Sequence, residues 1–302
     1  MIDGAVMKRI VWFVAVNFAV LVVITVVIEL LGLDRFLPAY GLSLGGVLAL
    51  SAVFGFGGAF VSLALSKWLA IRSMGVRRIG PPQSALESRL LSTVERHAQR
   101  LGLTTPEVGV FESPVMNAFA TGARREHALV AVSSTLAETM TPEELDAVLG
   151  HEMTHVANGD MITLALLQGV LNTFVIFLAR VIGSAIDGAM GNRREEGGGV
   201  FYFLIVIALE IVFGVLATVI VMAFSRRREY RADAGGAALA GTGNMIAALR
   251  ALQAGPAVEL PGQMRAFGIR GDVERGPLRR LFMSHPRIEE RIAALEAGAI
   301  RG

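Results

Sequence analysis

Four long apolar stretches restrict what this chain can fold into, because each is about as long as a lipid bilayer is thick. A helix needs about 20 mostly apolar residues to cross a membrane, whereas helices of soluble proteins average about 11–12 residues. Hydrophobic residues make up 53% of the chain and charged residues 18%, against about 25% charged in a typical soluble domain. We therefore expect a multi-pass membrane protein and not a set of buried core helices. The stretches are Ile10–Leu31, Leu42–Leu65, Met161–Ile182 and Val200–Phe224.

The first stretch occupies the position of a signal peptide. Its apolar run exceeds the roughly 7–15 residues typical of such peptides, and no small-x-small cleavage site follows it at once. We therefore expect it to remain in the protein as a membrane anchor.

Basic residues beside the apolar stretches predict the orientation of the chain, because Lys and Arg concentrate in cytoplasmic loops. If every stretch crosses once, all the basic clusters fall on one side, which is then the cytoplasm. The loops around Asp34–Arg35 and Asp187–Gly199 face outward, and residues 72–160 and 225–302 lie together in the cytoplasm. The clusters are Lys8–Arg9, Arg72 with Arg77 and Arg78, and Arg226–Arg228.

Two charged residues lie inside the apolar stretches. Arg180 is near the outer end of the third stretch and Glu210 is near the middle of the fourth. A charge in the membrane is costly and usually faces protein or water. Pairing within the helix bundle is the expected role, and a charge relay, as in a transporter, is the alternative.

The remaining sequence predicts a small mixed domain. Residues 84–101 have the apolar spacing of a helix, and three short apolar stretches predict a small β-sheet. Thr141, Pro142 and Glu144 form the signature of a capping box at the start of a helix. The predicted strands are Val108–Phe111, Met116–Ala120 and Ala128–Val132, and the later helices are Pro142–Asn158, Ser225–Leu239, Met245–Ala254 with Asn244 as cap, and one starting at Pro286.

The composition narrows the chemistry that this domain can carry. The chain has no cysteine, which excludes disulfides, thiol nucleophiles and Cys-ligated metals. Any metal ion must therefore be held by His, Asp or Glu. The net charge of +2 gives no support to a nucleic-acid partner.

The segment His151-Glu152-Met153-Thr154-His155 predicts a metal site. Residues four apart share one face of a helix, so both imidazoles can reach one ion. Glu152 stands beside that face, where it can act as a general base toward an attacking water. A helix surface that carries these residues by coincidence is the alternative.

A hydrolytic zinc site needs a third protein ligand and an open position. Glu229 and Asp233 are again four apart on a predicted helix, just beyond the fourth apolar stretch. Glu229 is the leading candidate for the ligand, and Asp233 can accept a hydrogen bond from a ligand histidine. Surface salt bridges with the neighbouring arginines are the alternative.

With these residues, the chain resembles the HtpX family of bacterial membrane-bound heat-shock metallopeptidases, which is related to the type-I CaaX prenyl proteases. The resemblance covers nearly the whole chain. It extends over the two N-terminal stretches, Ser113–Gly122, His151–Asp160, the next two stretches, Ser225–Asp233 and Ser284–Pro286.

The resemblance implies roles for particular residues. It makes His151, His155 and Glu229 the ligands of one Zn²⁺ per chain, Glu152 the catalytic carboxylate, and Asp233 a residue that supports a ligand. It also implies that Asn117 and Ala118 belong to an edge strand that binds substrate, and that His285 contacts the oxyanion. The alternatives are a turn residue for Asn117 and a helix cap for His285. His97 and His127 match nothing in the family, and we expect both at the surface.

The combined prediction is a mainly α membrane protein with about four transmembrane helices and a cytoplasmic α+β, zincin-like catalytic domain. The resemblance implies a zinc metalloendopeptidase of the bacterial inner membrane that cleaves unfolded or damaged membrane proteins on the cytoplasmic side, in membrane quality control under stress. A non-catalytic membrane scaffold with a structural metal site is the alternative. The predicted divisions are 1–80 and 161–224 for the membrane regions, and 81–160 and 225–302 for the two parts of the catalytic domain.

Overall fold

The computed structural model describes residues 43–190, 200–255 and 279–298. These residues form two compact units, each built from separate parts of the chain. The helical unit contains residues 43–62, 163–190 and 200–221. The sheet unit contains residues 63–162, 222–255 and 279–298.

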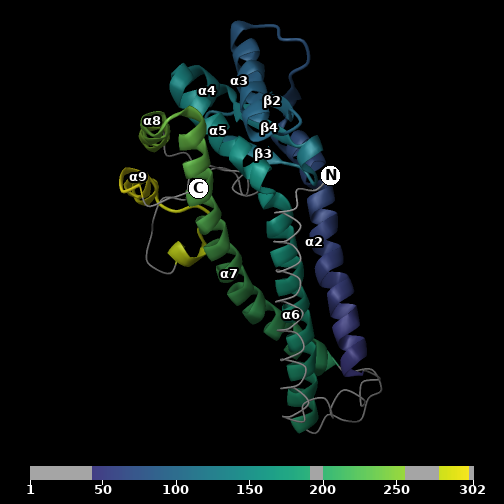
Figure 1. Ribbon diagram of the computed structural model, residues 1–302. Helices are drawn as coiled ribbons and strands as arrows, with labels where there is room; N and C mark the ends of the chain where they lie inside the picture. Colours follow the sequence, from purple (N-terminus) through teal and green to yellow (C-terminus); the bar gives the residue numbers. More distant parts are fainter. Residues whose placement is uncertain (1–42, 191–199, 256–278, 299–302) are drawn as a thin grey trace. The chain divides into compact units, whose positions relative to one another are not determined.

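Three long helices contribute to the helical unit: α2 (Leu44–Met74), α6 (Asp160–Ala189) and α7 (Val200–Ala240) (Figure 1). Within the described residues, these three are long and apolar enough to cross a membrane. Helices α6 and α7 contain the third and fourth predicted stretches, and α2 contains the second from Leu44 onward. Each helix extends beyond the C-terminal end of the stretch that predicted it. The first predicted stretch, Ile10–Leu31, lies outside the described residues.

Small residues let the helices of this unit approach each other closely. A Cβ on Gly55 of α2 would overlap the Thr173 side chain of α6. A Cβ on Gly169 of α6 would lie 2.6 Å from the Phe56 ring of α2. Such small-residue contacts are typical of helix pairs in membranes, where apolar burial from water cannot drive association.

The two charged residues of the predicted spans pair with each other. Arg180 Nη1 lies 2.9 Å from Glu210 Oε1 and also donates to the Ile176 carbonyl at 3.2 Å. Each charge thereby lowers the cost of placing the other in the membrane. This geometry is the pairing within the bundle that the sequence predicts for Glu210.

The sheet unit contains four strands in the order β1-β2-β4-β3. Strand β4 is the centre of the sheet, because it runs parallel to β2 and antiparallel to β3, and all five of its residues are buried. The predicted sheet is therefore confirmed, and it gains a strand, β1, in a segment that the sequence marked only as a basic cluster. The strands are β1 (Arg77–Arg78), β2 (Glu107–Phe111), β3 (Ala118–Thr121) and β4 (Leu129–Ser133).

Both faces of the sheet are covered. On one face, Val130 and Val132 pack with Leu149 and Met153 of α5 and with residues of α3 and α8. On the other, Phe111 and Phe119 pack against each other at a centroid separation of 5.5 Å and against the end of α2. The helices of this unit are α3 (Ala85–Leu101), α4 (Ser134–Thr139), α5 (Pro142–Asn158), α8 (Thr242–Ala254) and α9 (Ile288–Glu296), with short 3₁₀ turns η2 (Arg125–His127) and η4 (Arg279–Phe282).

The start of α5 follows from its capping box. The Thr141 hydroxyl accepts from the Glu144 N–H at 3.3 Å, and the Glu144 carboxylate accepts from the Thr141 N–H at 2.9 Å. Gly159 ends the helix in the left-handed conformation. The helix predicted over Pro142–Asn158 is confirmed with both ends.

Other helix boundaries differ from the prediction. The fourth apolar stretch and the segment Ser225–Leu239 form one continuous helix, α7. Helix α8 begins at Thr242 with Gly241 as its cap, because the Asn244 amide instead donates to the Ala240 carbonyl at 2.8 Å. Helix α9 begins at Ile288, two residues after the predicted start.

The surface prediction is wrong for His97. Its side chain is fully buried between α3 and α5, and its Nε2 lies 2.9 Å from Asp146 Oδ1 and 3.2 Å from the Asp146 carbonyl oxygen. Apolar spacing cannot identify a buried polar residue whose partner belongs to another helix. His127 is exposed, as predicted.

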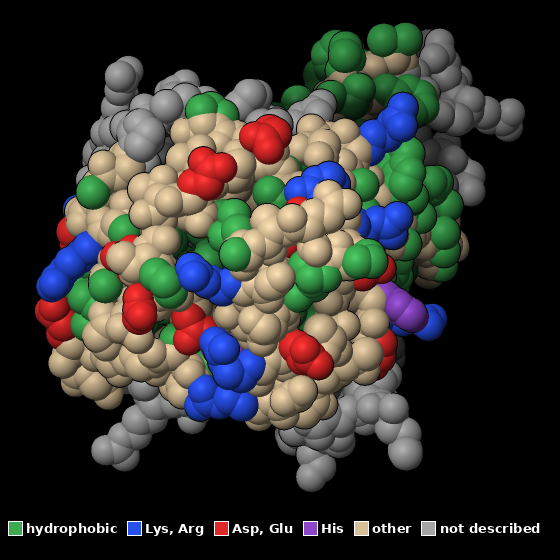
Figure 2. Space-filling model, turned by 90° about the horizontal axis from the view of Figure 1, so that it is seen from above, with side chains coloured by type: hydrophobic (Ala, Val, Ile, Leu, Met, Phe, Trp, Pro, Cys, Tyr) green, Lys and Arg blue, Asp and Glu red, His purple; other side chains and the backbone are tan. Residues whose placement is uncertain are grey.

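Acidic and basic side chains are interspersed over the face shown in Figure 2 and do not gather by sign. Mixed charge of this kind is typical of a solvated surface.

The approach of α7 to α5 depends on glycines. Gly150 of α5 and Gly236 of α7 meet, and a Cβ on Gly150 would lie 3.3 Å from the Gly236 Cα. A Cβ on Gly235 would overlap the Thr154 side chain. A Cβ at Gly235 needs the neighbouring atoms to shift, and one at Gly150 makes a tight contact between the two helices.

We predict that Gly235→Ala destabilises the protein by about 1–3 kcal/mol, the usual cost of overpacking. Gly243→Ala is the matched control, because a Cβ there meets open space and alanine favours a helix by up to about 1 kcal/mol. Thermal unfolding of the purified proteins measures both. Equal melting temperatures for the two variants would contradict the close approach.

Candidate metal centre

Helix α5 presents two imidazoles side by side. His151 and His155 are one helical turn apart, and their Nε2 atoms are separated by 3.2 Å. The rings are nearly perpendicular, at 87°. Both Nε2 atoms therefore point to one place, as the sequence spacing predicts.

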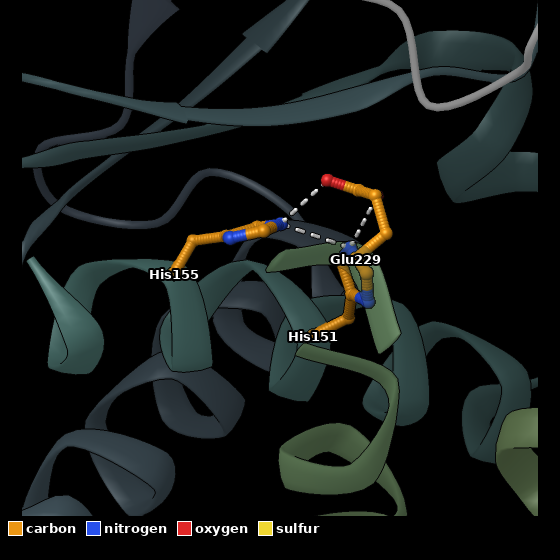
Figure 3. A group of neighbouring side chains, drawn as sticks. All are labelled: His151, His155 and Glu229. Carbon is orange, nitrogen blue, oxygen red and sulfur yellow. Dashed lines mark hydrogen bonds and ion pairs between the residues drawn. The ribbon is translucent and has the colours of Figure 1, made fainter. Parts of the chain in front are cut away.

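The Glu229 carboxylate reaches the same place from α7. Its Oε2 lies 3.5 Å from His151 Nε2, and its Oε1 lies 3.4 Å from His155 Nε2. Glu229 is 1% exposed. Figure 3 shows both imidazoles directed toward this carboxylate.

These three groups fit a zinc ion. Tetrahedral ligands at bond lengths of 2.0–2.2 Å are about 3.3–3.6 Å apart. The two Nε2 atoms are 3.2 Å apart, and each lies 3.4–3.5 Å from a different oxygen of the Glu229 carboxylate. All donor atoms lie within 4.8 Å of one another. Two imidazoles and one carboxylate also leave one tetrahedral position for a reacting group.

A carboxylate orients each histidine. His151 Nδ1 donates to Asp233 Oδ1 at 3.0 Å, in the position that the sequence predicts for Asp233. His155 Nδ1 donates to Asp160 Oδ2 at 2.6 Å. Such bonds select the tautomer that leaves Nε2 free to bind metal.

The role of Asp160 is not predicted by the sequence analysis. Asp160 is the first residue of α6, directly after Gly159, where the chain turns out of α5. The sequence does contain a signal for this role, because a glycine that ends the helix lies within five residues of a ligand histidine. The chain reverses at such a glycine, and the next side chain then points back toward the last turn of the helix. Arg228 supports the turn by donating to the Asp160 carbonyl at 3.1 Å.

Arg291 is a second residue that the sequence analysis misses. Its Nε donates to Asp233 Oδ2 at 2.8 Å and its Nη2 donates to Asp233 Oδ1 at 2.6 Å. Arg291 is 1% exposed. Burial acts to raise the pKa of Asp233, but the Arg291 guanidinium and the bond from His151 outweigh it and lower the pKa. Asp233 therefore stays ionised and keeps accepting from His151.

His285 lies against the third ligand. Its Nδ1 is 2.7 Å from Glu229 Oε2. Because Arg287 is the N-cap of α9, His285 does not occupy the cap position that the alternative reading gave it. Its contact with an oxyanion stays a prediction.

Glu152 is buried next to the two histidines, at 4% exposure. Its charge is among the influences that raise the pKa of His155. The Glu152 carboxylate is thus close to the three candidate ligands without being one of them, which is the arrangement expected of a general base.

Asn117 and Ala118 lie where the predicted substrate strand begins. Within the described residues, β3 pairs with β4 alone and forms an edge of the sheet. Asn117 contacts the β4 side: its N–H donates to Ser133 Oγ at 2.9 Å, and its carbonyl accepts from the Ser133 N–H at 2.8 Å. Ala118 is the first residue of β3. The other side of β3 faces away from β4, and substrate binding there stays a prediction.

Buried charges shape the proton affinity of the cluster. Burial acts to lower the pKa of His155, but the carboxylates of Glu229, Asp160 and Glu152 outweigh it and raise the pKa to about 10. Burial acts to raise the pKa of Glu229, but the imidazoles of His285, His155 and His151 hold it well below its usual value. The cluster therefore attracts a cation, which is a proton when no metal is bound.

The apolar helices and this centre are those of a membrane-bound metallopeptidase. Residues 84–299 match the profile of Peptidase family M48, and the chain belongs to this family. It is a multi-pass membrane protein and a metallopeptidase, and peptidases of this family depend on zinc.

Close relatives extend over nearly the whole chain. Protease HtpX of Xanthomonas euvesicatoria pv. vesicatoria is 56% identical over 293 residues, which cover 97% of this chain and 98% of the relative. The Protease HtpX homolog of Thiobacillus denitrificans is 54% identical over 291 residues, covering 96% and 99%. The crystal structure of S. mikatae Ste24p shares the fold, with a TM-score of 0.59 at 17% identity, over 95% of this chain and 67% of that one.

We predict that zinc affinity falls as the pH falls. Zinc binds neutral imidazole, and the pKa of about 10 for His155 means that the metal-free site holds a proton throughout the neutral range. Zinc must displace this proton, so its apparent affinity falls about tenfold for each pH unit below that pKa. Competition with a chromophoric chelator between about pH 8 and 6 measures the slope. In Asp160→Asn, affinity should be lower by about 10- to 100-fold near pH 8, with a shallower slope. An affinity that does not change with pH would contradict this account.

We also predict that Arg291→Met destabilises the protein by about 3–5 kcal/mol, because it leaves the Asp233 charge buried without its partner. Arg291→Met combined with Asp233→Asn should cost less than the sum of the single changes. The control is Arg250→Met, which breaks an exposed pair with Glu296 worth about 0–1 kcal/mol. Denaturant unfolding of the wild type and the four variants measures these costs. Additive single costs would show that Arg291 acts independently of Asp233.

Proposed function

We propose that this membrane protease is an endopeptidase that cleaves misfolded or damaged membrane proteins at the cytoplasmic face of the bacterial inner membrane. The observation that carries the proposal is the convergence of His151, His155 and Glu229 beside the buried carboxylate of Glu152. Membership of a family of membrane-bound metallopeptidases supports the proposal.

In this proposal, His151, His155 and Glu229 would hold the zinc ion, and Asp233 and Asp160 keep the two imidazoles in the binding tautomer. The zinc ion would polarise the scissile carbonyl and lower the pKa of water to about 7. Glu152 accepts the proton of the attacking water and delivers it to the leaving amine.

The edge strand provides a way to position the substrate. An extended polypeptide can add to the side of β3 that faces away from β4, starting at Asn117 and Ala118, through main-chain hydrogen bonds. Helix α5 packs beneath this strand through Leu149 and Met153. His285 is proposed to donate to the negative charge that develops on the carbonyl oxygen. Such binding needs an unfolded segment, which favours misfolded proteins as substrates.

The cytoplasmic orientation is supported by the distribution of basic residues. The sheet unit, which contains the metal centre, also contains the basic residues Arg72, Arg77, Arg78 and Arg226–Arg228. Each of these clusters follows an apolar stretch, as the positive-inside rule requires for cytoplasmic segments.

Membership of a peptidase family does not favour the non-catalytic scaffold, and the buried Glu152 has no use in a purely structural metal site. The transporter alternative depends on Arg180 and Glu210 as a relay, and these two residues form an ion pair with each other.

We predict that Glu152→Gln lowers the rate of cleavage by about 10²- to 10⁴-fold, the range expected for loss of a general base, while zinc content is unchanged. The purified protein in detergent is stripped with a chelator, zinc is restored, and cleavage of an unfolded test protein is followed. Glu143→Gln is the matched control, since Glu143 is an exposed residue of the same helix.

Zinc-dependent cleavage in the wild type and in Glu143→Gln, but not in Glu152→Gln, would support the proposal. Equal cleavage by Glu152→Gln would show that another group activates the water.

A further inference from the structure

Large hydrophobic side chains that are exposed gather on particular parts of this chain. Within the described residues, they lie on the candidate spans α2, α6 and α7 or, like Met190, directly after the end of α6, with two exceptions. The exceptions are Leu281 and Phe282, which are 41% and 43% exposed and lie on the turn η4 of the sheet unit. Exposed apolar side chains elsewhere in this chain mark contact with lipid, so these two need a partner of their own.

One arginine of α7 holds this turn. Arg226 Nη1 donates to the carbonyls of Met283, Arg280 and Leu281 at 2.8, 3.3 and 3.4 Å. Figure 1 shows η4 as the short yellow turn beside α7. One guanidinium thus binds three carbonyls in and directly after the turn and joins the turn to the helix.

The position of Arg226 along α7 gives the depth of the turn. Arg226 is two residues beyond Phe224, the last residue of the apolar stretch, and Arg227 beside it is exposed. The change from apolar to basic residues marks the boundary between the hydrocarbon and the headgroups. A turn bonded to Arg226 is therefore at the level of that boundary.

We propose that η4 is a membrane-contact turn, in which Leu281 and Phe282 insert into the interfacial layer of the bilayer beside α7. The partner is a lipid surface, and the contact continues the lipid-facing surface of the same helix. Apolar side chains next to arginines are the pattern of segments that lie in the interface, about 5–10 Å into the boundary between headgroups and acyl chains.

This contact reaches the metal centre through a short path. Met283 is buried next to the turn, and His285 follows two residues later with its bond to Glu229. The lipid surface thereby helps to hold the segment that carries His285. The membrane contact itself does not depend on the proposed substrate.

The depth of a tryptophan in the bilayer tests the proposal. Vesicle binding cannot test it, because the whole protein is already membrane-bound. Trp12 and Trp68, the two native tryptophans, are replaced by Phe, and Phe282→Trp is introduced into the full-length chain in lipid nanodiscs. The lipids carry bromine either near the ester end or near the methyl end of the acyl chain. Ile211→Trp, at a position 63% exposed on the apolar part of α7, is the control for lipid contact, and Gln99→Trp, at an exposed position of α3, is the control for water.

We expect Phe282→Trp to be quenched at least about twofold more than Gln99→Trp, and more by bromine near the ester end than near the methyl end. Emission that equals that of Gln99→Trp would overturn the proposal. Emission at short wavelength without quenching by either lipid would also overturn it, because protein would then cover the turn.

A second variant tests the role of Arg226. Adding Arg226→Gln to Phe282→Trp removes the guanidinium that binds the three carbonyls, and the quenching should fall by about half or more. Unchanged quenching would show that the turn reaches the lipid without this arginine and would overturn the depth argument.

Discussion

The close approach of α5 and α7 is the contact on which the metal centre depends. Helix α5 supplies two imidazoles and α7 supplies the Glu229 carboxylate, and these segments are far apart in the sequence. Gly150 and Gly236 meet where the helices cross, so the backbones come near enough for the short side chains to converge. The bond from His151 to Asp233 fixes the rotation of α7 about its own axis. With this geometry, Glu229 reaches both histidines at once.

This arrangement buries charged side chains, and each of them has a partner of opposite charge nearby. Asp233 and Glu229 are almost fully buried, and a buried charge without a partner would be unfavourable by several kcal/mol. Arg291 neutralises Asp233 from α9, and imidazoles surround Glu229. The carboxylates around the site still attract positive charge. This attraction raises the pKa of His155 and favours the binding of a divalent cation.

Much of the local structure was predictable because its causes are local. The capping box of Thr141 and Glu144 involves residues three apart, and it set the start of α5. Alternating and apolar runs identified three strands, while β1, only two residues long, carries no pattern of its own. The contact of Asp160 with His155 depends on the turn at Gly159, which apolar spacing does not reveal. Arg291 escapes prediction for a different reason, because it acts through Asp233, which only the folded chain brings near. His97 was misplaced on the same ground, because its partner Asp146 belongs to another helix.

The sequence by itself determined the class of protein. Apolar stretches of bilayer length and two histidines one helical turn apart have direct physical consequences, which do not depend on the rest of the fold. The sequence names Glu229 and Asp233 as candidates, and the tertiary structure alone brings these carboxylates, together with Asp160, to the two histidines. Glu229, Asp233 and Asp160 are three among many acidic residues, and their roles follow from helix crossing, from the turn at Gly159 and from the buried guanidinium of Arg291. Spacing along one helix fixes directions within a few residues, whereas distances between helices are set by packing.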